Sequence, residues 1–351
     1  MTLLNWLSLF STRARRRCHS SRDDRCCRCI PLTIALLVIA TAGCQPSRQS
    51  GTDQDETLHF AVIPKGETHI FWQSVKAGAV QAGEEEGARI TFKGPAKESD
   101  RDEQINVVQG FLNAQVDGLC LAPLDADALV RPVEEAGRAG VPVVIFDSGL
   151  NADPEDIVAF VATDNFRGGQ MAADALAASL NEQGDVILLR YNKGSDSTYQ
   201  REEGFLDRIA DYPEINVLSS DQYAGTTTES AIDKAQAVFN RYGDEVDGIF
   251  AVCEPNAEGV LRALQDRGLA GEVKFVAFDS SESLRAALAE EMVNAIVLQD
   301  PVRMGYLAVK TLSAHLKGEP VEPVVDTGVF VATPENRTDE TIARLLHPPQ
   351  S

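Results

Sequence analysis

The chain has 351 residues, with 53 Asp and Glu against 32 Lys and Arg, so its formal net charge at pH 7 is −21. Such an acidic surface repels the phosphates of nucleic acids and of anionic lipids, which argues against DNA binding and against adsorption to a membrane through charge. The length allows one large domain or two smaller ones.

The first segment has the pattern of an export signal. Arginines crowd the stretch before an apolar run at residues 32–42, and this run is about half as long as the roughly 20 residues that a membrane-spanning helix needs. Small residues and then Cys44 follow in "LTIALLVIATAGCQPSRQSG". This order resembles the lipobox of bacterial lipoproteins, although Thr41 stands where that family usually has leucine. We therefore expect a lipoprotein signal peptide at 1–43 and lipidation of Cys44. A plain secretory signal cut near Cys44 is the alternative.

A polar segment at 44–57 follows and has no apolar period. Its composition is typical of a flexible tether between a lipid anchor and a folded body. Beyond it the sequence has Cys120 and Cys253 as its remaining cysteines, too few for a disulfide framework. His and Cys do not show the spacing of a metal site, so we expect no metal, no cofactor and a fold held by its apolar core.

Short apolar runs rich in β-branched residues recur along the rest of the chain. Most are apolar almost throughout, which is typical of strands buried on both faces of a parallel sheet. The expected strands are residues 58–63, 88–94, 118–123, 141–147, 157–163, 185–190, 215–221, 247–253, 273–279, 294–300 and 324–332.

Stretches with helical periodicity separate these runs, for example residues 71–87, 165–181 and 226–242. In the last of them Glu229 lies three residues after Thr226, the spacing of a capping box. Strands and helices that alternate this often indicate a doubly wound α/β fold. About ten strands are many for one open sheet, so we expect two Rossmann-like α/β lobes with parallel sheets.

Ligands of open α/β sheets bind beyond the carboxyl ends of the strands, so the residues just after each expected strand are the candidates. Carboxylates, amides and aromatic rings predominate there; they can hydrogen-bond to hydroxyl groups and stack on an apolar ring face, as a sugar requires. No glycine-rich phosphate loop follows a strand. The candidates are Lys65, His69, Phe71, Trp72, Pro123, Leu124, Asp125, Asp147, Ser148, Tyr191, Asn192, Cys253, Glu254, Asp279, Ser280, Gln299 and Asp300.

Most of the chain from 57 to 333 resembles a known family. The stretches that carry the resemblance are "AVIPKGETHIFWQSVKAGA", "GLCLAPLDADALVRPVEEAGRAGVPVVIFD", "VATDNFRGGQMAADAL", "QREEGF", "VLRALQDRG", "FVAFDSS" and "LQDPVRMGYLAVKTL". In this order they resemble the type I periplasmic substrate-binding proteins, in the ribose- and allose-binding branch. The resemblance implies a non-catalytic protein that captures a small solute between two lobes and passes it to an ABC permease in the inner membrane.

The resemblance also implies a set of ligand-binding residues. Phe71 and Trp72 match an aromatic pair that sandwiches a sugar ring, and Arg201 matches an arginine that reaches the solute from the second lobe. The full set is Lys65, His69, Phe71, Trp72, Asp147, Arg201, Cys253, Asp279 and Gln299.

Three positions depart from the family pattern and leave the solute open. His69 replaces an asparagine, Ser148 stands where the ribose proteins have arginine, and Cys253 takes the place of a binding asparagine, with Asn256 nearby as a substitute. A pentose, a hexose, a furanose signal molecule and another polyol each fit this pattern.

Several of these residues also have ordinary structural interpretations. The carboxylates Asp147 and Asp279 could be helix N-caps, and Gln299 could cap the helix that begins near Pro301. Arg201 could form a surface ion pair with a neighbouring glutamate. Phe71, Trp72 and Cys253 could be core residues, and Lys65 could be solvated.

The resemblance also implies three crossovers between the lobes, which would form a hinge. The expected N-terminal lobe comprises residues 57–163 and 300–327, and the C-terminal lobe comprises 164–299 and 328–340. Closure of this hinge around a sugar or polyol is the expected mechanism. We expect a monomer in the periplasm, held to the membrane by its lipid alone.

Other functions share parts of this pattern. A sugar sensor, which docks a chemoreceptor or a histidine kinase in its closed form, is the main alternative. Asp147 and Asp279 could serve acid/base catalysis in an enzyme, but no nucleophile–base arrangement accompanies them. A sugar-responsive repressor conflicts with the export signal and the acidic charge.

Overall fold

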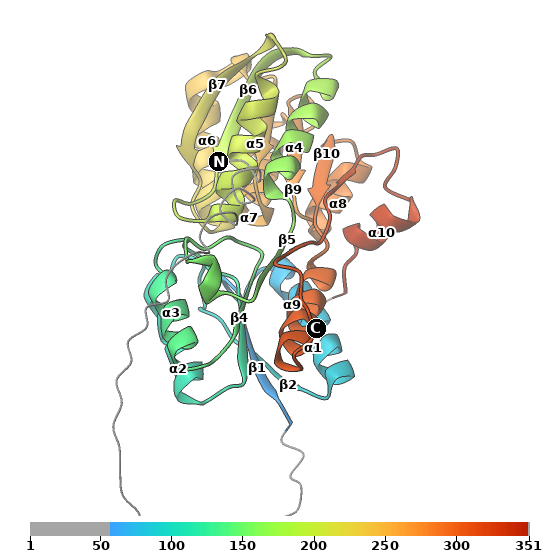
Figure 1. Ribbon diagram of the computed structural model, residues 1–351. Coiled ribbons are helices and arrows are strands. Elements are labelled where there is room, and N and C mark those ends of the chain that lie inside the picture. Colours follow the sequence, from blue (N-terminus) through green and yellow to red (C-terminus); the bar gives the residue numbers. More distant parts are fainter. Residues whose placement is uncertain (1–56, 350–351) are drawn as a thin grey trace, which may run out of the picture. The chain divides into compact units, whose positions relative to one another are not determined.

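The structure is a computed structural model that describes residues 57–349 (Figure 1). The expected signal peptide, the lipidation site Cys44 and the expected tether up to residue 56 lie outside the described residues. None of the helices within 57–349 is long and apolar enough to cross a membrane.

Six strands form the first sheet, in the order β11-β5-β4-β3-β1-β2, and every neighbouring pair is parallel. The expected runs form the four inner strands because their side chains are mostly buried between two helical layers, whereas the edge strands β2 and β11 are partly exposed. The strands are β1 (His59–Ile63), β2 (Arg89–Phe92), β3 (Gly118–Leu121), β4 (Val143–Phe146), β5 (Ala159–Ala162) and β11 (Val324–Asp326).

The second sheet repeats this arrangement in the order β12-β10-β9-β8-β6-β7. Its strands are parallel except that β12 runs antiparallel to β10. The strands are β6 (Gln183–Arg190), β7 (Glu214–Tyr223), β8 (Gly248–Ala251), β9 (Lys274–Phe278), β10 (Ala295–Leu298) and β12 (Phe330–Ala332).

Helices cover both faces of each sheet, with one apolar cluster on each face. On the first sheet α1 (Ile70–Glu86) and α9 (Pro301–Leu316) pack on one face, and α2 (Arg101–Asn113) and α3 (Val130–Arg138) on the other. On the second sheet α4 (Asn165–Ser179) and α5 (Asp196–Ile209) pack on one face. The opposite face carries α6 (Thr228–Tyr242), α7 (Glu254–Arg267), α8 (Glu282–Ala289) and α10 (Glu340–Leu346). In the described part of the chain, two short 3₁₀ helices span Pro154–Asp156 and Gly243–Glu245.

Each sheet with its helices is one lobe, called the N-terminal and the C-terminal lobe below. The chain passes between the lobes three times: from β5 to α4, from β10 to α9 and from β11 to β12. Thr163 and Thr327 connect the first and third crossovers through their hydroxyl groups, whose oxygens lie 3.2 Å apart. The expected fold class, two doubly wound α/β lobes, is confirmed. The lobe boundaries expected near residues 163, 299 and 327 stay a prediction of which segments move together when the lobes open and close.

Two local expectations are wrong. The run 324–332 forms two strands, β11 and β12, because the chain turns at Gly328 (φ 90°) and continues in the other sheet. The capping box of α6 is formed by Thr227 and Ser230, because Thr227 has the extended backbone of an N-cap and its side chain accepts from the Ser230 amide.

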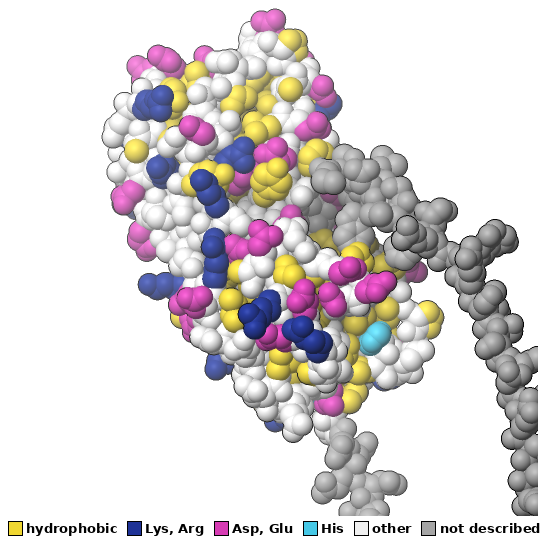
Figure 2. Space-filling view, turned by 60° about the vertical axis from the view of Figure 1, so that its left-hand side comes forward, with side chains coloured by type: hydrophobic (Ala, Val, Ile, Leu, Met, Phe, Trp, Pro, Cys, Tyr) yellow, Lys and Arg dark blue, Asp and Glu magenta, His cyan; other side chains and the backbone are white. Residues whose placement is uncertain are grey.

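The surface shows no single dominant feature on the face in Figure 2. Acidic side chains are spread over both lobes among basic ones, and hydrophobic side chains appear in small separate groups. Among residues 57–349 the large hydrophobic side chains that are most exposed are Tyr199, Leu316 and Val324.

Candidate functional site

A cleft of about 370 Å³ lies where loops after the strands of both sheets face each other. All nine residues of the set implied by the family resemblance line it, although ligand contact by each of them stays a prediction. Of the other candidates after strands, Tyr191 and Glu254 line it, whereas Pro123, Leu124, Asp125, Ser148, Asn192, Ser280 and Asp300 do not. The lining residues are Lys65, His69, Phe71, Trp72, Glu98, Asp147, Tyr191, Ser197, Thr198, Arg201, Cys253, Glu254, Pro255, Asp279 and Gln299.

Lys65 connects the two lobes on one side of this cleft. Its ammonium group lies 2.9 Å from Asp147 Oδ2 within the N-terminal lobe. It also donates to Ser197 Oγ, at 2.8 Å, on α5 of the C-terminal lobe. Lys65 is only 4% exposed, so it is not a solvated surface lysine. Ser148, where the ribose proteins have arginine, accepts from the Ser197 amide at 3.1 Å and adds a second contact between the lobes.

Asp147 and Asp279 occupy equivalent places in the two lobes, directly after β4 and β9. Both have left-handed backbones, with φ of 63° and 69°, a conformation that is uncommon outside glycine and that clusters at functional sites. The N-cap interpretation is wrong for both. The residues that cap the nearest following α-helices are Asp164 for α4 and Ser281 for α8.

Arg201 is a buried arginine of the C-terminal lobe and is only 2% exposed. It donates to Asn165 Oδ1 at 2.8 Å and to the carbonyl of Val252 at 2.9 Å. Its guanidinium lies 3.6 Å from Asp279 Oδ2 and 3.8 Å from the centre of the Phe278 ring. The surface ion-pair interpretation is therefore wrong.

The glutamates next to Arg201 in the sequence have another partner. Glu202 and Glu203 both pair with Arg190. Because Arg190 pairs with both glutamates, neither of them binds Arg201, which lines the cleft.

The position of α5, which carries Arg201, depends on two glycines. A Cβ at Gly169 of α4 would lie 2.0 Å from the carbonyl oxygen of Arg201, and a Cβ at Gly204 would lie 2.0 Å from that of Phe166. Glycine at these two positions therefore lets the backbones of α4 and α5 approach more closely than a residue with a Cβ would allow. This close crossing places Arg201 at the edge of the cleft.

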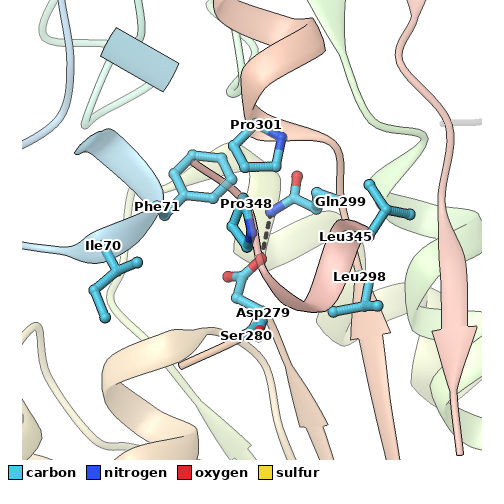
Figure 3. A pocket seen from close by; sticks show the side chains of 9 residues that line it. All are labelled: Ile70, Phe71, Asp279, Ser280, Leu298, Gln299, Pro301, Leu345 and Pro348. Atoms are coloured by element: carbon cyan, nitrogen blue, oxygen red, sulfur yellow. Dashed lines mark hydrogen bonds between the residues drawn. The ribbon is translucent and has the colours of Figure 1, made fainter. Parts of the chain in front are cut away.

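Gln299 directly follows β10 and donates to Asp279 Oδ1 at 2.7 Å (Figure 3). Burial raises the pKa of Asp279, although Arg201 and Gln299 oppose the rise. The side-chain nitrogen of Gln299 thus has a partner. Its oxygen, Oε1, is a buried acceptor with no donor in reach among the described residues. Asp300 caps α9 through the Arg303 amide, so the capping interpretation of Gln299 is wrong.

A smaller chamber of about 280 Å³ adjoins the cleft and shares Phe71, Asp279 and Gln299 with it. Figure 3 shows how Phe71 approaches from α1 while Asp279 and Gln299 approach from the strands of the other lobe. Leu345 of α10 and Pro348 line the chamber from the C-terminal end of the chain.

The aromatic pair Phe71 and Trp72 begins α1, with ring centres 4.9 Å apart and planes at 86°. Trp72 is only 3% exposed and also packs on Phe146 in the core. Both interpretations therefore apply to Trp72, which belongs to the core and also lines the cleft. Cys253 lines the cleft as a buried thiol, and burial raises its pKa well above the usual range. Asn256 does not replace the missing asparagine; it donates to the carbonyl of Arg190 and does not line the cleft.

Glu98 was not predicted from the sequence, yet it is the most highly connected acid of the cleft. Its carboxylate accepts from Trp72 Nε1 at 2.6 Å, contacts His69 Nδ1 at 2.7 Å and accepts from the Tyr191 hydroxyl at 2.6 Å. Burial would raise the pKa of Glu98, but His69, Lys65 and Tyr191 together lower it to about 2. The pKa of His69 is raised although burial opposes this, because Glu98 outweighs the burial.

Comparison with known proteins identifies the chain's relatives. Residues 60–320 match the periplasmic binding protein domain family. The chain belongs to this family. The family predicted from the sequence is thereby confirmed.

Curated relatives of this periplasmic binding protein include ribose import binding proteins. The ribose import binding protein of Haemophilus influenzae is 31% identical over 286 residues, which are 80% of this chain and 93% of the relative. The ribose import binding protein of Escherichia coli K12 is 30% identical over 267 residues, 75% of this chain and 86% of the relative.

Solved structures of solute-binding proteins share the fold. One from Agrobacterium radiobacter, in complex with D-arabinose, is 33% identical with a TM-score of 0.80 and covers 84% of this chain and 100% of its own. One from Agrobacterium vitis, with bound D-fucose, is 35% identical with a TM-score of 0.79 and covers 82% of this chain and 100% of its own.

Proposed function

We propose that this periplasmic binding protein captures a small sugar or polyol between its lobes and delivers it to an ABC importer. Relatives named for ribose, allose and xylitol binding support the solute class. Because the ribose relatives are named for import, we propose import rather than sensing as the role of this chain.

The observation that carries this proposal is the composition of the cleft. Carboxylates from both lobes, the guanidinium of Arg201 and the amide of Gln299 line the cleft together with the Phe71 ring. A sugar presents hydroxyl groups that both donate and accept, and a ring face that is apolar. The free Oε1 of Gln299 requires a donor, which a hydroxyl group supplies.

Closure of the lobes would explain capture. Residues from both lobes contribute to one cleft, so a solute that bridges them binds the closed form better than the open one. Any group left unpaired on closing costs about 1–3 kcal/mol, which would discriminate between sugars that differ in one hydroxyl.

A thermal-shift screen of the purified protein against D-ribose, D-allose, D-arabinose, D-fucose, D-tagatose and xylitol tests the proposal. A ligand that binds only the folded protein stabilises it by about 2.7 kcal/mol at a hundred times its dissociation constant. We expect at least one member of the panel to raise the melting temperature of the natural protein. The same sugar should raise the melting temperature of the Asp279→Ala variant much less. No shift with any member would contradict the solute class. Recovery of the sugar unchanged after long incubation would support a role without catalysis.

We further propose that the chain is exported and held by a lipid on Cys44, which lies outside the described residues. The proposal rests on the order of basic, apolar and small residues before that cysteine. Expression in a bacterial host should place the natural chain in the membrane fraction and Cys44→Ser in the soluble fraction. Equal distribution of the two would contradict lipidation.

The permease partner and the monomeric state are also proposals. Light scattering on the purified protein should give the mass of one chain with and without the sugar. A permease from the same genome, reconstituted in vesicles, should hydrolyse ATP faster when the loaded protein is added. A stable dimer, or no stimulation, would contradict the respective proposal.

A further inference from the structure

The N-terminus of α1 is capped by a residue of the opposite lobe. His69, at the N-cap position, makes no capping hydrogen bond with its own side chain, and the first turn of α1 has no acidic residue. Instead the Phe71 amide of the N-terminal lobe donates to Glu254 Oε2 of the C-terminal lobe at 3.3 Å. Free amides at a helix N-terminus need an acceptor. Glu254 therefore provides the capping acceptor that the residues of α1 do not provide themselves.

The charged groups that face Glu254 come from both lobes. His69 faces it from the start of α1, with Glu98 bound to the imidazole. Asp279 faces it from the loop after β9, with Arg201 beside that carboxylate. Opening of the lobes would move α1 away from α7, which begins at Glu254, and would return the carboxyl group to water.

Closure changes the proton affinity of this group. Burial raises the pKa of Glu254 to about 7, against the opposing effects of His69 and of the α1 amides. A carboxyl group exposed to water in an open cleft would have a pKa near its ordinary value of 4.5. A group with the higher pKa in the closed form binds a proton more tightly there, so falling pH favours closure and rising pH opposes it.

We propose that Glu254 joins α1 to the opposing lobe on closure and takes up a proton as it does so, which couples solute capture to pH. This inference rests on the proposed function, because it describes the closing of the same cleft. With the values above, the solute should bind about tenfold more tightly at pH 6 than at pH 8.

Titration calorimetry of the full chain with the sugar that gives the largest thermal shift tests the coupling. Measurements at pH 6 and pH 8, in buffers of different ionisation enthalpy, give the affinity and the number of protons taken up. Glu254→Gln keeps an acceptor for the α1 amides and cannot ionise. It should bind more tightly than the natural protein at pH 8 and lose most of the pH dependence. Glu254→Ala removes the acceptor and should bind more weakly at both pH values.

Glu258→Gln is the matched control, because Glu258 lies on the same helix but contacts Ser281 and Ser283 within its own lobe. It should keep the natural affinities and pH dependence. The proposal is overturned if Glu254→Gln retains the full pH dependence, or if it weakens binding at pH 8 as much as Glu254→Ala does.

A second measurement separates this inference from the proposed function. Hydrogen exchange at the Ile70 and Phe71 amides needs no solute, because it reports the contact in the fraction of molecules whose lobes are closed, the arrangement that the structure shows. It should be faster in Glu254→Ala than in the natural protein and unchanged in Glu254→Gln. Equal rates in all three proteins would overturn the capping role even if a sugar binds. Failure of every sugar to bind, with the expected exchange rates, would overturn the proposed function alone.

Discussion

Tyr191 of the C-terminal lobe donates its hydroxyl hydrogen to Glu98 of the N-terminal lobe, with 2.6 Å between the two oxygens. Both side chains are buried, and burial followed by the charge of Glu98 raises the pKa of Tyr191 well above its usual range. The phenol therefore stays protonated and remains a donor at physiological pH. A hydrogen bond to a buried carboxylate is among the stronger ones, so this pair favours the closed arrangement of the lobes.

Removing this hydrogen bond should weaken solute binding. Tyr191→Phe deletes the donor and leaves the ring in place. A hydrogen bond to a charged group contributes about 1.5–3 kcal/mol, so we expect the dissociation constant to rise about tenfold or more. Titration calorimetry measures this, with Tyr199→Phe as the control because Tyr199 is 52% exposed. An unchanged affinity in Tyr191→Phe would show that the pair does not support closure.

Glu98 should contribute to folding stability in a pH-dependent way. Its pKa in the folded protein, about 2, lies below its ordinary value of 4.5. A carboxyl group of this kind stabilises the fold above pH 4.5 and loses this contribution as the pH falls toward 2. Glu98→Gln should therefore be less stable than the natural protein at pH 7, by on the order of 3 kcal/mol.

Chemical unfolding at pH 7, 4 and 3 measures this difference, which should shrink as the pH falls. Glu86, whose pKa is also lowered to about 2, chiefly through Lys310, is present in both proteins and cancels. Glu319→Gln at an exposed position is the control. A difference that stays constant with pH would contradict the assignment to the Glu98 charge.

The crossing of α4 and α5 should tolerate no side chain. Gly169→Ala places a methyl group on the carbonyl of Arg201, so α5 must shift and carry that side chain with it. We expect a loss of about 1–3 kcal/mol in unfolding free energy and a weaker solute affinity. Gly110→Ala in α2 is the control, because its Cβ would meet nothing within 4 Å. That control should be neutral or slightly stabilising. Equal stability of both variants would contradict the account of the crossing.

Gln299 should matter for binding more than for folding. Gln299→Leu removes the hydrogen bond to Asp279 and also the unpaired Oε1, two effects that oppose each other. The solute-free protein should change in stability by about 1 kcal/mol or less, whereas solute affinity should fall at least tenfold. Melting temperatures with and without the sugar measure both effects. A large loss of stability without the sugar would show that Gln299 is chiefly structural.

The sequence predicted much of this architecture for a physical reason. Buried parallel strands need continuous apolar runs, and the residues that follow such strands must gather at one edge of a sheet. Asp147, Asp279 and Gln299 were found in this way, and the structure brings all three to the cleft. The family resemblance added Arg201, which lies inside a helix and not after a strand.

The rest depends on contacts that sequence patterns do not record. Glu98 lies several residues beyond β2, in a loop, and its importance comes from partners on two other segments, the start of α1 and the loop after β6. Glu254 follows a strand and was among the candidates, but its role comes from the start of a helix in the other lobe. Only the tertiary arrangement of α1 and α7 reveals it.

The most direct test of the central claim is a calorimetric titration of the natural protein and of Arg201→Ala with the sugar that gives the largest thermal shift. We predict one sugar per chain with a micromolar or lower dissociation constant, and a loss of at least a hundredfold in affinity with Arg201→Ala. Binding that is unaffected by this change, or a stoichiometry that differs from one, would place the solute outside the cleft between the lobes and contradict the account.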